Sequence, residues 1–543
     1  MPRPRASHLM LPAMLAVIAT SLILAFMYFV NVPMSPDGGW YAYPAYAWAN
    51  GGDPSENLAG FETVHRTTGN VIAMFGWENR SNLTVPAMGL WFELLPASAA
   101  SIALLGLLQW LAIAMLASLA VWTVSKDWLM SAFAGLITLS DSRLIAEAIS
   151  DARPDVPVLL VALGLLVAML LVAERRGGIL AILAAVALAA ALPLVHVTSA
   201  NAIAALSAFL VFRAFDEWRG GVRLPRLAIL LLPAAVMCVT FLVRQPILDW
   251  LVPTSVPASV EALGQHSLVQ KLKEIVASGF THKLSMEIAR WAHQFHPANL
   301  AQLIALLSGV AIAVWLVRSV KDDAVRLAFL LAAGVVSGAV VMFAVDPHHT
   351  SGHALVLAVV GYSAAAIAVA RARIHATLAA RYAVPAAVAL LLLAAGLKLV
   401  HAGIIEARYA RAGISTAQLT SALESAITET AAAFPGSAVR IEGASEIWPY
   451  LTHRGERIEI VDPDRETFPG SKVRSPDHAA RLLVISDDHY KWGWQPILNG
   501  WRQAGLITPL REIGRCGETS RCLEIYRIEN KSTVGTTGTS QLH

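Results

Sequence analysis

The stretch LMLPAMLAVIATSLILAFMYFVNVPMSPDGGW, residues 9–40, joins an apolar run to a turn that contains a carboxylate and two glycines. The apolar run Leu9–Val30 has roughly 20 residues, which is the length that a transmembrane helix needs. Arg3 and Arg5 precede it, as basic residues precede the apolar part of a signal peptide, but no small-residue cleavage pattern follows the run. We therefore predict an uncleaved first membrane helix that ends shortly before Asp37.

The composition indicates a chain that crosses a membrane several times. Of its 543 residues, 56% are hydrophobic and only 15% are charged, and the mean hydropathy is +0.57. Soluble domains carry about 25% charged residues. The formal net charge of +3 is too small to indicate binding to nucleic acid, and the basic residues stand in short clusters between apolar runs. The distribution of charged residues therefore indicates how the chain is oriented in the membrane, and it does not indicate a charged binding partner.

Apolar runs of near-bilayer length predict about eleven spans in all. After Leu9–Val30 they are expected at Ala99–Val124, Leu129–Ile149, Val156–Ala173, Ile179–Val195, Val197–Phe215, Leu227–Val243, Leu300–Val317, Leu327–Val345, Ala354–Ala370 and Ala383–Val400.

The loops between these spans predict the orientation of the chain, because short cytoplasmic loops collect Lys and Arg. One side receives Arg175, Arg176, Arg213, Arg219, Arg223, Arg226, Arg318, Lys321, Arg326, Arg371, Arg373 and Arg381. The opposite side receives Asp37, Asp151, Asp155, His196, His348, His349 and the tail after His401. We predict that the N-terminus is cytoplasmic, that the tail lies outside, and that the protein is a multi-pass protein of the inner (plasma) membrane.

The predicted fold is an α-helical polytopic membrane protein with a small extracytoplasmic α/β C-terminal domain. The membrane module is expected over residues 1–403, with long outer loops at 31–98 and 248–297, and long loops on one face of a bundle usually carry function. Residues 404–530 are expected to form the α/β domain, and the Ser/Thr/Gly-rich end 531–543 to be disordered. The expected strands are Ala438–Glu442, Arg457–Val461, Arg481–Ser486 and Leu523–Ile528, and the expected helices are Thr416–Phe434 and Gln495–Ala504.

The first outer loop places an acid among aromatic residues. The aromatic residues of the stretch Trp40–Trp48 fit an interfacial belt, which needs no further role to explain it. Asp37 differs, because a carboxylate at the membrane edge is unfavourable unless it is solvated, paired or bound to a metal. The two glycines after it allow a ligand to approach the backbone closely. Glu78 and Arg80 follow in the same loop, where they form either a solvated turn or a part of the site.

A second acidic turn, SDARPD, lies at the start of a later span. Its residues Asp151, Arg153 and Asp155 stand where one span surfaces and the next one enters. Both acids could be helix-start residues, since Asp favours the positive end of a helix. Two acidic turns with an arginine in each loop also suit a phosphate and a reacting hydroxyl, because guanidinium matches phosphate oxygens and carboxylates accept protons or hold cations.

These motifs together resemble the GT-C type glycosyltransferases. The resemblance rests on an Asp after the first membrane helix, the Gly/aromatic sequence with GGDP behind it, the outer RPD and Pro that open an apolar helix, about eleven spans and an outer C-terminal domain. The protein O-mannosyltransferases, the aminoarabinose transferase of lipid A and the mycobacterial arabinofuranosyltransferases belong to this superfamily. The resemblance implies a hexosyl- or pentosyltransferase that takes its sugar from a polyprenyl-phosphate donor.

The resemblance also implies roles for individual residues. Asp37 matches the family's acid of the first outer loop, which is the expected catalytic base or metal contact; the cation would be Mg or Mn. Glu78 and Arg80 match an acid-then-lysine pattern, with Arg in place of Lys, and would bind substrate or phosphate. Asp155 matches the outer acid before the fourth helix and is the second expected catalytic residue, with Asp151 as its rival for that match; Asp151 is otherwise expected to bind substrate or phosphate.

The second outer loop and two histidine positions are further candidates. Apolar residues at helical spacing in residues 268–295, with Lys271, Lys273, Lys283 and Arg290 between them, predict amphipathic helices that lie in the interface or hold the donor phosphate. His348 and His349 stand in the turn VDPHHTSGH, where they could be ordinary interfacial histidines, contact substrate or phosphate or, less simply, hold zinc. His196 at the end of its span, Arg153 and Lys271 are expected to bind substrate or phosphate.

Cys516 and Cys522 bracket a short turn in the tail and predict a disulfide in an oxidising compartment. The sequence thus predicts a membrane glycosyltransferase that moves a sugar to an extracytoplasmic acceptor, in contact with membrane lipids and without nucleic acid. Two alternatives stay open. One is a secondary transporter or flippase for a lipid-linked solute, and the other is a non-catalytic scaffold that binds components of the cell envelope.

Overall fold

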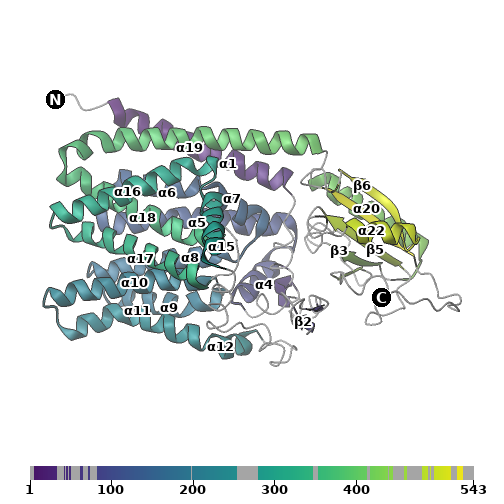
Figure 1. The fold of residues 1–543 in the computed structure, drawn as a ribbon, viewed down its shortest axis with the longest axis horizontal. Helices are drawn as coiled ribbons and strands as arrows, with labels where there is room; N and C mark the ends of the chain where they lie inside the picture. The colour runs from purple at the N-terminus through teal and green to yellow at the C-terminus, as the bar shows by residue number, and fades with distance from the viewer. Residues whose placement is uncertain are drawn as a thin grey trace. The chain divides into compact units, whose positions relative to one another are not determined.

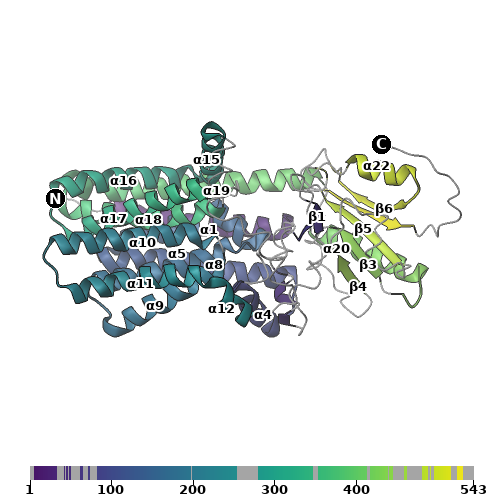
Figure 2. The ribbon, with the colours of Figure 1, turned by 60° about the horizontal axis from the view of Figure 1, so that its bottom comes forward.

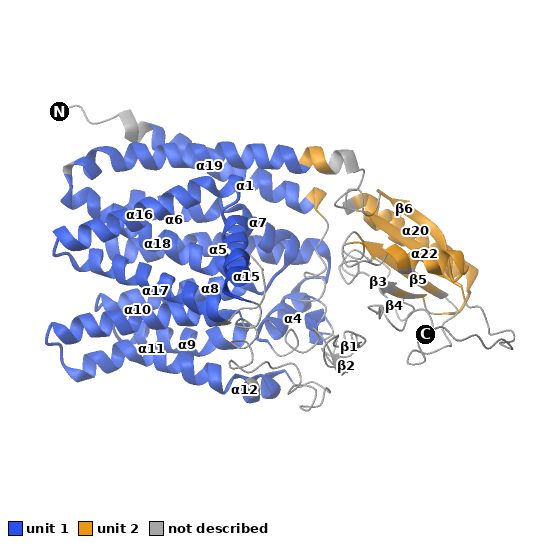
Figure 3. Cartoon of the chain, in the orientation of Figure 1, with its two compact units in different colours: residues 1–29, 41–54, 77–405 blue, residues 30–40, 55–76, 406–543 orange. Residues whose placement is uncertain are grey.

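The chain divides into two units, which Figure 3 colours separately. Unit 1 comprises Met1–Phe29, Tyr41–Pro54 and Trp77–Ile405, and unit 2 comprises Val30–Trp40, Ser55–Gly76 and Glu406–His543. The structure is a computed structural model, and it describes residues 5–32, 42, 44–46, 48–49, 62–64, 71–73, 82–196, 198–252, 279–345, 352–412, 416–437, 439–443, 458–461, 480–486, 490, 495–514, 516 and 522–529.

Unit 1 is a bundle of membrane helices (Figure 1). Its long helices are α1 (Arg5–Asn31), α5 (Ala99–Ser125), α8 (Asp155–Ala173), α9 (Gly178–Val195), α10 (Ser199–Arg219), α11 (Leu224–Leu242), α16 (Leu300–Ser319), α17 (Asp323–Val345), α18 (Gly352–His375) and α19 (Thr377–Ala412). The shorter elements are α4 (Thr84–Leu94), α6 (Trp128–Leu139), α7 (Ser142–Ala146), η1 (Glu147–Asp151), α12 (Arg244–Leu251), α15 (Phe280–Gln294) and η2 (Pro297–Asn299).

The number of spans agrees with the sequence prediction. Within the described residues, ten helices are long and apolar enough to cross a membrane; α6 and α7 with η1, which are bent by 54°, bring the number to eleven when they are counted as one bent span. The chain is therefore a multi-pass membrane protein with about eleven spans. Hydropathy was sufficient to predict these helices, because an apolar segment in a bilayer must satisfy its backbone polar groups internally, and a helix does so.

Helix α18 occupies the centre of the bundle. Of its most apolar window, 94% is buried, against 33% to 72% for the other spans. Small residues allow its neighbours to approach closely: a Cβ on Gly309 of α16 would lie 2.2 Å from the Cβ of Ala365. Small residues at helix contacts are typical of membrane bundles, where packing rather than water exclusion holds helices together.

The bent span breaks at Ser140 and Asp141, between α6 and α7. The break leaves carbonyl groups without helical partners, and such groups are costly within a membrane. Side chains from other helices bind them: Trp110 Nε1 donates to the carbonyl of Leu139 at 3.0 Å, and Gln302 Nε2 donates to that of Ser140 at 2.9 Å. The break is therefore a built feature of the bundle.

Helix α15 differs from the prediction in which of its faces is buried. It is amphipathic, as expected, and it crosses the direction of the spans (Figures 1 and 2). Its charged residues Lys283, Glu287 and Arg290 are buried, whereas Phe280 and Ile288 are 67% and 61% exposed. Glu287 Oε1 lies 3.2 Å from Lys283 Nζ and 3.0 Å from Arg290 Nη1. The polar face thus packs inward, and the apolar face is free to contact lipid.

Ion pairs join the helices at the end of the bundle where α10 ends and α17 begins. Arg213 of α10 contacts Asp323 of α17 through two hydrogen bonds of 2.7 and 3.0 Å, and its Nε lies 3.1 Å from Glu217 Oε1. Arg226 Nε lies 3.3 Å from the other oxygen of Glu217. This is one of the basic clusters that predict the cytoplasmic side.

Unit 2 contains a five-stranded mixed sheet in the order β4-β3-β5-β7-β6. β3 pairs in parallel with β4 and β5, and β7 pairs antiparallel with β5 and β6. Its elements are α20 (Thr416–Ala433), β3 (Val439–Gly443), β4 (Ile458–Val461), β5 (Ala480–Ser486), α22 (Gln495–Gln503), β6 (Ile507–Ile513) and β7 (Leu523–Ile528). A separate hairpin pairs β1 (Glu62–Val64) with β2 (Val71–Ala73).

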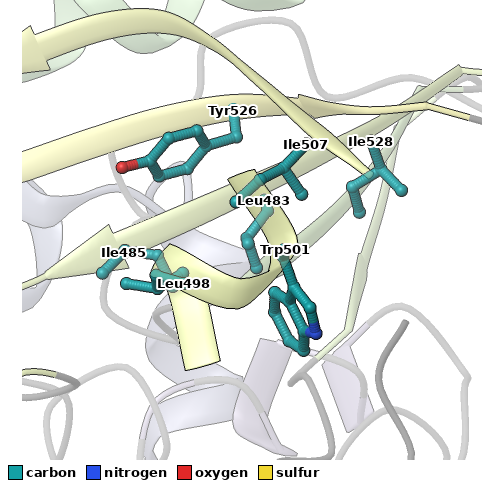
Figure 4. Packing of buried hydrophobic residues seen from close by; sticks show 7 residues of the cluster. All are labelled: Leu483, Ile485, Leu498, Trp501, Ile507, Tyr526 and Ile528. Atoms are coloured by element: carbon teal, nitrogen blue, oxygen red, sulfur yellow. The ribbon is translucent and has the colours of Figure 1, made fainter. Parts of the chain in front are cut away.

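The core of unit 2 lies between α22 and the sheet (Figure 4). Leu498 and Trp501 of α22 pack with residues of β5, β6 and β7. The predicted α/β character and all four predicted strands are confirmed, but β6 was not predicted. A disulfide joins Cys516 to Cys522 ahead of β7.

Candidate functional site

The candidate site is built around residues 147–155, which we call the acidic turn. α7 continues into the single π-helical turn η1, and α8 begins at Asp155. Between them Ala152 has φ +47°, in the left-handed region that non-glycine residues rarely adopt. Single π turns and strained backbone residues gather at functional sites. The irregular backbone of the acidic turn therefore makes it a candidate for a functional site.

Arg153 bridges two buried carboxylates in this turn. Its Nε lies 3.2 Å from Glu147 Oε2 and 3.3 Å from Asp155 Oδ2. Both carboxylate residues are 0% exposed, and Arg143 of α7 forms a further ion pair with Glu147. Buried charges are tolerated only when they are paired, so each of these four groups depends on the others.

The first turns of three helices converge on Asp155. It is the first residue of α8, and Gly352, the first residue of α18, lies so close that a Cβ there would be 2.6 Å from Asp155 Oδ2. Thr198, just before α10, supplies a hydrogen bond to the Asp155 side chain. Because helix N-termini carry partial positive charge, they favour ionised carboxylates and bound anions at this point.

His196 lies beside Asp155 and is almost completely buried. The backbone N–H of Thr198 donates to its Nδ1 at 3.3 Å, and the Thr198 hydroxyl lies 3.0 Å from the same nitrogen. Burial lowers the pKa of His196 to about 3, although the charge of Asp155 acts in the opposite direction. His196 is therefore neutral at physiological pH. His353 of α18 is also buried and interacts electrostatically with Asp155.

A cleft opens onto the acidic turn. It has a cavity volume of about 80 Å³ and lies between α4, α5 and the start of α8. Glu147 and Arg153 supply its charged groups, and most of the remaining wall is apolar, including Met88, Ile102 and Leu105. Ligand sites commonly combine an apolar wall with a few polar groups that fix orientation. An amphiphilic molecule with an ionic head matches this arrangement.

The structure brings together some of the residues that the sequence predicted. Asp151, Arg153, Asp155 and His196 lie at one end of the bundle, and Ser150 Oγ donates to Asp151 Oδ1 at 3.0 Å. Asp155 stands in the first turn of α8 without capping it, so its position fits the helix-start alternative as well as the functional one. The other predicted residues lie outside the described residues: Asp37, Glu78, Arg80, Lys271, His348 and His349.

Sequence reasoning missed Glu147 and Arg143. Both fall inside the apolar run Leu129–Ile149, which was interpreted as one uninterrupted span. Ionisable residues inside a span are functional candidates by default, and this signal would have identified them.

The part of the chain that the structure describes contains no group of three or more His, Cys, Asp or Glu residues that could hold a metal ion. Glu147 and Asp155 are instead engaged by Arg153. The described residues therefore do not fit a metal centre, and the predicted metal contact, Asp37, lies outside them.

Comparison with known proteins identifies the fold. No family model matches the chain, and no curated protein is similar to it in sequence. The crystal structure of ArnT from Cupriavidus metallidurans bound to undecaprenyl phosphate matches with a TM-score of 0.53 and 14% identity, over 94% of this chain and 97% of that chain. The apo state of the same protein gives a TM-score of 0.51 and 15% identity over the same shares.

A weaker likeness is to the Archaeoglobus fulgidus oligosaccharyltransferase in complex with Zn and sulfate. Its TM-score is 0.46 and its identity 12%, over 87% of this chain and 68% of that one. The match to ArnT shows that the chain shares the fold of that protein, which agrees with the resemblance to GT-C type glycosyltransferases seen in the sequence.

Proposed function

We propose that this chain, which has the GT-C fold, is an integral-membrane glycosyltransferase that moves a sugar from a polyprenyl-phosphate donor to an extracytoplasmic acceptor. The observation that carries the proposal is the buried pair Glu147 and Asp155, bridged by Arg153 at the edge of an apolar cleft. The ArnT structure with undecaprenyl phosphate supports a donor of this chemical class.

The ionic groups of the turn suit the phosphate end of such a donor. Transfer breaks the bond between the anomeric carbon and a phosphate oxygen, so that polyprenyl phosphate leaves with an additional negative charge. In the proposed mechanism Arg153 stabilises that charge, helped by the N-termini of α8 and α18. Glu147 and Asp155 hold the guanidinium in place through contacts of 3.2 and 3.3 Å. Arg153 is 11% exposed at its side chain, which leaves it reachable from the cleft.

The other half of the reaction needs a base. The acceptor hydroxyl forms the new bond to the anomeric carbon and loses its proton, and we assign that proton to Asp37. Glu78, Arg80, Lys271, His348 and His349 belong to the proposal as residues that bind the substrates. Asp151 and His196 line the same end of the bundle as Asp155. No step requires a divalent cation; if transfer depends on Mg or Mn, Asp37 is the ligand that we expect.

The apolar wall of the cleft suits the isoprenoid part of the donor. Ile102 and Leu105 of α5 and Val156 of α8 line it. A lipid chain lowers its free energy by about 0.8 kcal/mol for each buried methylene group. The donor would thus be held by its tail, while its phosphate meets Arg153.

The proposal predicts release of free polyprenyl phosphate by the reconstituted protein. Purified protein in liposomes receives a panel of polyprenyl-phosphate sugars and a crude envelope acceptor fraction. We expect Asp37→Asn to abolish release and Arg153→Gln to lower it about a hundredfold, as loss of one electrostatic stabiliser does. The matched control is Arg373→Gln, which removes an arginine paired with Asp127 at the far end of α18 and should retain activity.

A secondary transporter or flippase is the second candidate, because one observation favours it. Transporters often carry broken helices, and the span made of α6 and α7 is bent by 54°. The same liposomes separate the two functions. Movement of an intact donor across the bilayer without release of polyprenyl phosphate would support transport, and neither movement nor release from any donor would support a scaffold.

A further inference from the structure

Asp141, at the break of the bent span, is the most completely hydrogen-bonded side chain near the site. It is 0% exposed. Its Oδ1 accepts from the backbone N–H groups of Arg143 at 2.9 Å and Leu144 at 3.2 Å, and from Asn299 Nδ2 at 2.9 Å. Its Oδ2 accepts from Gln294 Nε2 at 3.0 Å and from the Tyr362 hydroxyl at 2.9 Å. Five donors thus converge on one carboxylate.

These donors come from elements that are far apart in the chain. Gln294 is the last residue of α15, Asn299 ends η2, and Tyr362 lies in the central helix α18. Only the two backbone groups belong to α7 itself. The Asp141 carboxylate therefore connects the start of α7 to α15, η2 and α18 through hydrogen bonds.

The side chain of Asn299 makes further hydrogen bonds to the start of α7. Its Oδ1 accepts from the backbone N–H of Ser142 at 2.9 Å and from the Ser142 hydroxyl at 2.8 Å. Lys398 of α19, which is also fully buried, donates to the same oxygen at 3.1 Å. Because every one of these groups is buried, removing one leaves its neighbours unsatisfied.

The direction of α7 decides where the ionic groups of the acidic turn lie. α7 has five residues, and η1 follows it without an intervening loop. Glu147 opens η1 directly after α7, so a rotation at Asp141 would carry Glu147 away from Arg153. An element this short does not hold a direction by its own hydrogen bonds.

We propose that Asp141 is a positioning residue, which links helix α15 to the acidic turn and holds Glu147 in register with Arg153. Its effect on catalysis rests on the proposed function, whereas its effect on the acidic turn does not. It touches neither donor nor acceptor in this role. It acts by fixing α7, and it makes the geometry of the acidic turn depend on where α15 lies.

The chain supplies a matched control for simple helix capping. Asp127 caps α6 as Asp141 caps α7, accepting from the backbone N–H groups of Leu129 at 3.1 Å and Met130 at 3.3 Å. Among the described residues its hydrogen bonds reach neither α15 nor the acidic turn, and it pairs with Arg373 instead. A general loss of helix capping would therefore affect Asp127→Asn and Asp141→Asn alike.

The test measures amide hydrogen exchange and transfer kinetics of the full-length protein in liposomes. In Asp141→Asn we expect exchange in residues 142–153 to accelerate about tenfold or more, because the amide nitrogen cannot accept hydrogen bonds. We expect kcat to fall about tenfold to a hundredfold, with a smaller change in the KM of the donor, as misplacement of a reacting group predicts. Asp127→Asn should accelerate exchange only around the start of α6 and keep its kcat.

A milder variant covers the case in which Asp141→Asn does not fold. Gln294→Met keeps the volume of the side chain and removes the α15 donor to Asp141 together with the hydrogen bond between Gln294 and Tyr362, and it should also accelerate exchange in residues 142–153. The proposal is overturned if a folded Asp141→Asn or Gln294→Met leaves exchange in the acidic turn unchanged, or if Asp127→Asn accelerates it equally. If wild type shows no transfer, the proposed function fails, and the exchange measurement still decides the role of Asp141.

Discussion

Gly352 lies so close to the Asp155 carboxylate that there is no room for a side chain at position 352. A Cβ on Gly352 would come within 2.6 Å of Asp155 Oδ2 and within 3.0 Å of Glu147 Oε2. The first residue of the central helix α18 thus packs directly on both buried carboxylates. The absence of a side chain at this position is what allows the helix N-terminus to reach the acids.

Gly352→Ala should therefore displace the carboxylates. The added methyl group must push Asp155 or Glu147 away, and Arg153 then loses one of its two contacts. We expect release of polyprenyl phosphate to fall about tenfold or more, since small misplacements at reacting groups have large effects. The comparison is Gly396→Ala in α19, where a Cβ would meet nothing within 4 Å. Equal activity of both variants would contradict the packing seen at Gly352.

Arg213→Gln should lower the thermal stability of the membrane bundle. The substitution removes the bidentate contact with Asp323 and leaves the buried carboxylate of Glu217 with Arg226 as its ion-pair partner among the described contacts. Because Glu217 keeps Arg226 and Asp323 is 58% exposed, we expect a loss of about 1–2 kcal/mol rather than the roughly 3 kcal/mol that an uncompensated buried charge costs. The midpoint of thermal unfolding in detergent measures this effect. Arg326→Gln, which removes a half-exposed arginine 3.6 Å from Asp216, should shift the midpoint much less.

Stability should fall as the pH is lowered below about 6.5. Burial holds the pKa of His196 at about 3, whereas an unfolded histidine has its ordinary value of 6.5. Between these values the unfolded state binds the additional proton, so the free energy of unfolding rises with pH. At pH 5 the difference amounts to about 2 kcal/mol relative to pH 7.

His196→Gln should remove much of this pH dependence. Unfolding midpoints of wild type and variant, measured in detergent from pH 5 to pH 8, would show a steeper decline for wild type. His282→Gln, at an exposed histidine of α15, serves as the control. Parallel curves for wild type and His196→Gln would assign the acid sensitivity to other groups.

The predicted topology can be tested with the cysteines of the chain. Cys238 is free in α11, and Cys516 and Cys522 form a disulfide. In a Cys238→Ser background, a membrane-impermeant maleimide should label Cys516 and Cys522 in intact spheroplasts only after reduction. Arg219→Cys, in a background without other cysteines, should be labelled only after the membrane is permeabilised. The reverse pattern would show that the tail is cytoplasmic.

The membrane helices could be predicted from the sequence because a bilayer leaves few choices to an apolar run. The prediction Ala354–Ala370 lies within α18 (Gly352–His375), and Val156–Ala173 matches α8. The break at Asp141 could not be derived in this way, since its donors Asn299 and Tyr362 stand 158 and 221 residues later. The mean hydropathy of Leu129–Ile149 does not reveal the helix break within it, because side chains from distant parts of the sequence stabilise that break.

Two other differences have local physical causes. β6 was missed because Pro509 interrupts its pattern and the pairing with β7 shifts between Pro509 and Arg511. For α15 the period of apolar residues predicted a helix, but periodicity does not say which face meets protein. The charged residues Lys283 and Arg290 turned inward, where Glu287 lies between them.

The break at Asp141 also bears on how the protein is made. When α6 and α7 leave the ribosome, the Asp141 carboxylate has not yet met Asn299 or Tyr362, which stand 158 and 221 residues later in the chain. A carboxylate near the centre of an isolated helix opposes insertion by about 3 kcal/mol. We therefore expect the bent span to insert stably only when the helices that carry Asn299 and Tyr362 are present. The order in which the helices assemble would then differ from the order of their synthesis.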